Sequence, residues 1–222
     1  MAERVLSSEM QPQSTVPTSA VPTPAATQSS SVTLKAKNAI NRFLTTGGAL
    51  WIAHYVLQLV MGLSEGKVSM NSRFSPFDGF CFMAAIVCFC IGLGWLSTQI
   101  RPRTALAVTG LTFAIIAGVA IIVGAAAFMW KQQAPGVLGA VGVVGSCLSA
   151  TFAALAARRT NALPPRLANL LLLIGLLTFP LIVAFTWPGQ FVPSYLTDEL
   201  PFALSGIAYI TFARGLSRST IA

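Results

Sequence analysis

The feature that most constrains the fold is an uncharged run, residues 135–157, that reads PGVLGAVGVVGSCLSATFAALAA. It is apolar apart from hydroxyls and one thiol, and about 20 apolar residues suffice for a helix to cross a bilayer. At helical spacing its small residues form two adjacent lines, and small residues four apart let helices approach closely in lipid. The lines are Gly142, Ser146, Ala150, Ala154 and Gly145, Ser149, Ala153, Ala157. We expect the central helix of a membrane bundle.

The composition supports this interpretation. The chain is 55% hydrophobic and only 9% charged, whereas soluble domains carry about 25% charged residues. Apolar segments of nearly spanning length predict an all-α, polytopic membrane protein with a six-helix transmembrane bundle. The expected spans are 47–63, 79–100, 105–130, 135–157, 167–187 and 200–216, of which the first and last are the shortest and least apolar.

The remaining segments are polar or basic. Residues 1–33 are rich in Pro, Ser and Thr, which predicts a disordered tail or, as the alternative, a docking or phosphorylation segment. Residues 34–45 form a short basic amphipathic pattern, typical of a helix on the membrane surface or of the first turns of the next span. The spans then occupy 46–218, and 219–222 form a C-terminal tail.

Lys and Arg predict the orientation. Ten of them flank the spans on the side of both termini and three on the other side, so the positive-inside rule places both termini in the cytoplasm. Five arginines on that side could gather anionic lipid headgroups. These are Arg101, Arg103, Arg158, Arg159 and Arg166. No basic run with interleaved aromatic residues suggests nucleic acid.

Small-residue faces recur in other spans. The third span carries Gly110, Ala114 and Gly118, and the first carries Ala49 and Ala53. Such faces suit packing within the chain, a homo-oligomer or a larger membrane complex. A proline in the fifth span, Pro180, predicts a kink that is either static or a hinge.

One polar and aromatic stripe lies inside a span. Trp51, His54, Tyr55 and Gln58 follow the i, i+3, i+4, i+7 spacing of one helical face. The stripe should point into the bundle because polar groups facing lipid are costly. It either makes hydrogen bonds between helices or lines a site where rings stack on a flat ligand and His54 and Gln58 bind it.

Other chemistry is sparse. No carboxylate falls within a predicted span, which argues against proton- or cation-coupled transport. We expect Thr197 to cap the last helix with Asp198 and Glu199 in its first turn, so these acids need no ligand. With a single histidine and no GxSxG or HExxH motif, we expect no enzyme, metal site or cofactor.

Two functional hypotheses follow. The first is a non-enzymatic structural or accessory subunit that packs through its small-residue helix faces. The alternative is a binding or transport protein for a small, mostly apolar molecule, built on the first-span stripe and the fifth span.

Overall fold

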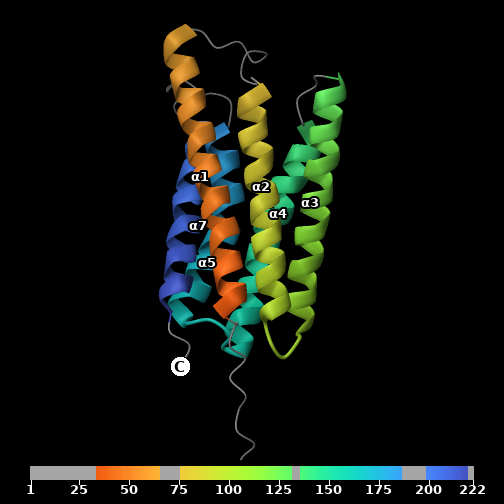
Figure 1. Ribbon diagram of the computed structural model, residues 1–222, viewed down its shortest axis with the longest axis vertical. Helices are drawn as coiled ribbons and strands as arrows, with labels where there is room; N and C mark the ends of the chain where they lie inside the picture. The colour runs from red at the N-terminus through yellow and green to blue at the C-terminus, as the bar shows by residue number, and fades with distance from the viewer. Residues whose placement is uncertain (1–33, 66–75, 132–135, 187–198, 220–222) are drawn as a thin grey trace, which may run out of the picture.

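The computed structural model describes residues 34–65, 76–131, 136–186 and 199–219, so the predicted tail at 1–33 lies outside the described residues. The described part of the chain is all-helical (Figure 1). Its six helices are α1 (Leu34–Glu65), α2 (Pro76–Gln99), α3 (Ala105–Lys131), α4 (Gly136–Thr160), α5 (Pro165–Thr186) and α7 (Leu200–Arg218). Each predicted span therefore coincides with a helix, within a few residues at either end, except that α1 begins at Leu34, well before the predicted start at residue 47.

Five of these helices, all except α7, are long and apolar enough to span a membrane. The helix α7 forms where the sixth span was predicted, but polar residues such as Ser205, Thr211 and Arg214 make it less apolar than the others. Its inward face is buried, and α1 and α5 pack against it on either side.

The segment 34–45 is part of α1 and not a separate element. The helix continues without a break for 32 residues, so the segment forms the first turns of the following span. Its apolar residues Ile40 and Leu44 are fully buried in the bundle. Lys37 is also buried, and its Nζ donates to the backbone oxygen of Ser219 at 2.6 Å, which joins the start of α1 to the end of α7.

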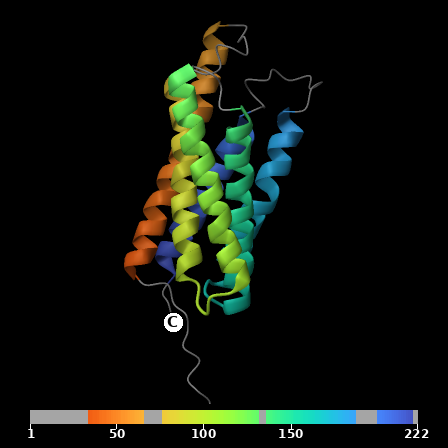
Figure 2. The same cartoon turned by 90° about the vertical axis from the view of Figure 1, so that its right-hand side faces the viewer.

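The helices form a ring of five with one helix outside it. The contacts run α1–α2, α2–α4, α4–α5, α5–α7 and α7–α1, while α3 packs against α2 and α4. Figure 2 shows α3 on the near face of the bundle. Much of its outward surface is apolar and exposed, including Ile115, Val119 and Ile122.

The two predicted lines of small residues on α4 are buried in the bundle. All eight residues are buried, and they let α2, α3 and α5 approach α4 closely. A Cβ atom on Gly145 would lie 2.8 Å from Cβ of Ala117 on α3, so nothing larger than glycine fits there. Gly110 faces α4, since its Cβ would lie 3.2 Å from the backbone nitrogen of Ala153.

On α1, the close helix contact uses a different residue from the one predicted. Ala49 is exposed, so it does not pack within the bundle, and the close approach uses Gly48 instead. A Cβ atom on Gly206 of α7 would lie 2.7 Å from the carbonyl oxygen of Gly48. The two backbones therefore touch at this crossing.

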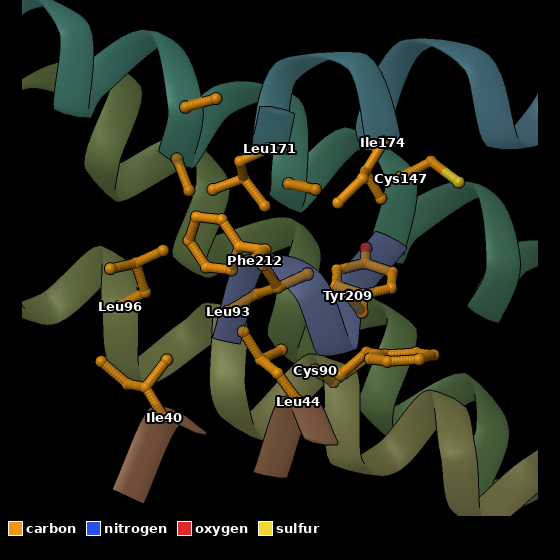
Figure 3. Close-up of a cluster of buried hydrophobic side chains, with 14 of the residues drawn as sticks. Ile40, Leu44, Cys90, Leu93, Leu96, Cys147, Leu171, Ile174, Tyr209 and Phe212 are labelled. Atoms are coloured by element: carbon orange, nitrogen blue, oxygen red, sulfur yellow. The ribbon is translucent and has the colours of Figure 1, made fainter. Parts of the chain in front are cut away.

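The core below the crossing is apolar. Figure 3 shows side chains of α1, α2, α4, α5 and α7 meeting in one cluster, with Tyr209 and Phe212 of α7 among them. The helix α5 continues through Pro180, and Thr178 joins it to α7 because the hydroxyl groups of Thr178 and Ser205 lie 2.9 Å apart.

Basic residues gather at one end of the bundle. The start of α1, the connections α2–α3 and α4–α5 and the end of α7 all lie at the lower end in Figure 1. The five arginines of the two connections are exposed there. The helix ends that carry the basic residues predicted for the side of both termini therefore lie together at one end of the fold.

Replacing Ala150 by leucine should destabilise the bundle. Ala150 is completely buried on α4, and overpacking a tight core costs about 1–3 kcal/mol. The thermal unfolding midpoint in detergent, followed by circular dichroism, should fall. Ala126→Leu, at an exposed position on α3, is the matched control and should change it little. An Ala150→Leu midpoint equal to that of the control would contradict the packing described.

Candidate functional site

His54 lies where α1, α2 and α7 meet at the upper end of the bundle. The Gly48–Gly206 contact between α1 and α7 fixes where along the bundle axis His54 lies. The helices α1 and α7 run antiparallel. His54, six residues beyond Gly48, and Glu199, seven residues before Gly206, therefore lie about 9–11 Å from the crossing on the same side. Close backbone packing thus brings the two side chains together.

The Nδ1 atom of His54 faces Asp78. Asp78 is in the first turn of α2, is fully buried, and its Oδ1 lies 2.6 Å from Nδ1. The side-chain nitrogen of Gln58, one turn beyond His54 on α1, donates to the other carboxylate oxygen at 2.5 Å. The start of a helix also stabilises a negative charge. Asp78 is therefore held from both α1 and its own helix.

The Nε2 atom of His54 faces Glu199. Oε2 of this residue lies 2.9 Å from the ring nitrogen. Glu199 is the N-cap residue of α7 but makes no side-chain capping hydrogen bond. The expectation that Thr197 caps α7 and that its acids serve only the helix end is thus wrong for Glu199, whose carboxylate pairs with His54. Thr197 and Asp198 lie outside the described residues.

The geometry sets a minimum number of protons. A neutral imidazole has one donor and one acceptor nitrogen, whereas both ring nitrogens of His54 lie within hydrogen-bond distance of carboxylate oxygens. Two hydrogen bonds therefore need one proton more than a neutral imidazole and two carboxylates supply. That proton resides on the ring, because imidazole is a stronger base than a carboxylate.

The carboxylates overturn one expectation. Asp78 was placed outside the second span, but it lies within α2 and within the part of it that is apolar enough to span a membrane. The premise that disfavoured proton- and cation-coupled chemistry is therefore wrong. Asp78 and Glu199 form, with His54, a site that we call the acid–histidine triad.

The predicted stripe divides between two roles. His54 and Gln58 belong to the triad, but Trp51 is buried in an aromatic cluster, with its ring centroid 4.7 Å from that of Phe89 and 5.2 Å from that of Phe202. Tyr55 is half-exposed and has no part in the triad's hydrogen bonds. The stripe therefore does not form one stacking surface for a flat ligand.

A cavity opens beside the triad. Its volume is about 440 Å³, and the five helices of the ring supply its wall. His54 and Glu199 are its only ionisable lining residues among those described, whereas Asp78 lies behind His54. The remaining wall is apolar or aromatic and consists of Phe82, Gly136, Gly139, Ala140, Val143, Phe179, Ile182 and Phe202.

The arrangement does not suit a metal ion. The described residues contain no group of three or more His, Cys, Asp or Glu side chains able to hold one. Asp78 and Glu199 lie at opposite nitrogens of the same ring, so their oxygens and the ring nitrogens do not converge on one point.

Sequence reasoning found His54 and Gln58 but missed both acids. Each acid directly precedes a predicted span, since the second begins at residue 79 and the last at residue 200. A span boundary drawn from hydropathy therefore leaves both acids just outside the predicted spans. The sequence signal that could have identified them is an acidic residue immediately before an apolar span, in a chain whose single histidine lies within another span.

Comparisons with known protein families, curated proteins and solved structures find no match for this chain.

Replacing His54 alone by phenylalanine should destabilise the fold more than replacing His54 and Asp78 together by apolar residues. The single variant leaves the buried Asp78 carboxylate without its ring partner, and breaking a buried ion pair costs about 3–5 kcal/mol. The double variant His54→Phe, Asp78→Leu removes that charge as well. Its thermal unfolding midpoint should lie above that of His54→Phe. A double variant that is less stable than the single one would show that Asp78 does not depend on His54.

Proposed function

We propose that this is a non-enzymatic integral membrane protein that binds a small, mostly apolar molecule in the cavity beside the triad. The observation that carries this proposal is the cavity itself, an apolar space of about 440 Å³ with two ionisable groups at one side of its wall. Ligand sites combine mostly apolar walls with a few well-placed polar groups. Five helices of suitable length and composition support the membrane location.

The cavity lies inside the ring of helices. Residues of α1, α2, α4, α5 and α7 contribute to its wall, so a ligand there would contact most of the bundle. The glycines at the start of α4, Gly136 and Gly139, leave the space that larger side chains would fill. A bound molecule would place its apolar part against the phenylalanines and its polar group beside Glu199.

The accessory-subunit hypothesis has less support. Its main argument was the small-residue faces, but those of α4 are buried between α2, α3 and α5 and are not available to a partner. The exposed apolar surface of α3 could still pack against another protein or a second copy of the chain. We therefore keep assembly as the second candidate and binding as the first.

We further propose that the arginine-rich end faces the cytoplasm and contacts anionic lipid headgroups. Exposed arginines of both connections lie at this end, which supports the positive-inside orientation. Arg101 and Arg103 follow α2 directly, and Arg158 and Arg159 end α4. They would lie at the headgroup level of an anionic leaflet.

Native mass spectrometry of the protein released gently from its own membrane tests the binding function. We expect one stoichiometric small molecule on the wild-type chain. Ala140→Phe, which fills the cavity from α4, should lose it, whereas Ala126→Phe on the outside of α3 should keep it. Extra protein mass on a chain that carries no small molecule would favour the accessory role and contradict ours.

Cysteine labelling in intact cells tests the orientation. Asn161→Cys, exposed at the arginine-rich end, should not react with a membrane-impermeant thiol reagent. Ser194→Cys, in the connection between α5 and α7, should react, since that connection joins two helix ends at the opposite end of the bundle. The reverse pattern would invert the topology.

A further inference from the structure

A groove runs along the outside of the bundle between α2 and α3. Its volume is about 550 Å³, and it is separate from the cavity beside the triad, because the two share no lining residue. Six residues of each helix line it, at positions that recur every three or four residues and therefore share one helical face. None of these residues is charged, so the groove is apolar along its whole length.

Small residues form the floor of the groove, and large branched residues form its sides. Cys90, Gly94 and Ala114 are buried where the two helices meet. Ile115 and Ile122 on α3 are more than half exposed beside them. The difference in side-chain size along one helix face thus creates a long, narrow depression.

The glycines in the groove are not required by the packing of α2 against α3. A Cβ atom on Gly94 would lie 3.5 Å from the nearest side-chain atoms of α3, and one on Gly118 would lie 3.6 Å from Cβ of Cys90. These are ordinary van der Waals distances, unlike the 2.8 Å at Gly145. The glycines therefore leave a space that contact between the two helices does not need.

Two exposed arginines lie at one end of the groove. The connection from α2 to α3 is at this end, because the two helices that form the groove are consecutive and antiparallel (Figure 1). It contains Arg101 and Arg103, and Arg101 follows Thr98, the last lining residue of α2, by three positions. A positive end and an apolar length are complementary to an anionic headgroup and its acyl chain.

The length of the groove corresponds to one leaflet of a bilayer. From Val87 to Thr98, α2 advances by eleven residues, which is about 17 Å along the helix axis. One leaflet supplies half of a hydrocarbon core that is about 30 Å thick. Trp95 lies toward the arginine end and is 38% exposed, as is typical of indole rings at the membrane interface. An acyl chain that starts beside the arginines would therefore end near the bilayer centre.

A second copy of the chain suits this groove less than a lipid does. Two copies in one membrane have the same orientation, and a symmetric dimer uses the same surface on both. Contact along this face would bring Arg101 and Arg103 of both copies close together at the same depth. These like charges would repel each other, whereas a phosphate group would pair with them.

We propose that the groove binds one anionic phospholipid, with an acyl chain along α2 and α3 and its phosphate at Arg101 and Arg103. Guanidinium groups bind phosphate through paired hydrogen bonds. This inference rests on the proposed contact between the arginine-rich end and anionic headgroups, and it names one site and one ligand class there. It does not depend on the ligand of the cavity.

Native mass spectrometry with two lipids of identical acyl chains tests this site. The probes are the anionic dioleoylphosphatidylglycerol and the zwitterionic dioleoylphosphatidylcholine, each titrated onto the full chain in detergent. We expect the first phosphatidylglycerol to bind at least about tenfold more tightly than the first phosphatidylcholine, because two arginines attract its headgroup.

Gly118→Leu tests the apolar part of the site. A side chain at this position enters the groove without a clash, so the variant should fold and bind the first phosphatidylglycerol at least about tenfold more weakly. Ala126→Leu, on the same helix but outside the groove, should bind as the wild type. A phosphatidylglycerol with a photoactivatable diazirine in its acyl chain provides a measurement on the wild type itself. Its cross-links should lie on the groove face of α2 and α3, and cross-links confined to other helices would contradict the site.

Replacing both Arg101 and Arg103 by glutamine tests the charged part. This variant should lose the preference for phosphatidylglycerol and keep its binding of phosphatidylcholine. The matched control replaces Arg158 and Arg159 by glutamine, which removes the same charge from the same end of the bundle. It should keep the preference.

The outcomes separate the groove site from the other proposals. Equal losses in the two arginine variants would overturn the groove site and leave general headgroup contact intact. A wild type without preference for phosphatidylglycerol would contradict both. A lipid that is lost in Ala140→Phe but kept in Gly118→Leu would belong to the cavity, and this too would overturn the groove site. A second copy of the chain, bound to the wild type without lipid and lost in Gly118→Leu, would assign the groove to a dimer instead.

Discussion

His54 forms the hydrogen bonds that hold the upper end of the bundle together. Its two ring nitrogens bind carboxylates from two other helices, so α1, α2 and α7 meet at one side chain. Burying three ionisable groups is expensive unless each is paired. Here the imidazolium of His54 pairs with both carboxylates. The first turn of α2 and the amide of Gln58 further stabilise the carboxylate of Asp78.

The apolar part of the bundle makes this pairing possible. Contact between Gly48 and Gly206 brings α1 and α7 together, and Trp51 packs against Phe89 and Phe202 just below His54. Elsewhere in the bundle, the small residues of α4 let α2, α3 and α5 pack closely against that helix. Between these two packed regions, at the start of α4, glycines leave the cavity open. Close packing on one side and the open cavity on the other thus place the Glu199 carboxylate between the His54 ring and the apolar cavity wall.

Much of the fold could be predicted from the sequence, because apolar runs and small-residue spacing are local signals. Residues 135–157 indicated the central packing of α4, and the arginines indicated which helix ends lie together. The site was less accessible. The stripe marked His54 and Gln58, but its other members took different roles, since Trp51 packs in the core and Tyr55 is only half-buried and outside the triad. Asp78 and Glu199 reach His54 only through tertiary packing, from 24 and 145 residues away along the chain, and no local pattern encodes that.

The most direct test of the account is the protonation of His54 in a bilayer. Because His54 is the only histidine of the chain, labelling histidine with ¹⁵N gives solid-state NMR signals that need no assignment. We predict that at neutral pH both ring nitrogens carry a proton and that both are hydrogen-bonded, as the two carboxylate contacts require. A spectrum with one bare ring nitrogen, typical of a neutral imidazole, would contradict the acid–histidine triad.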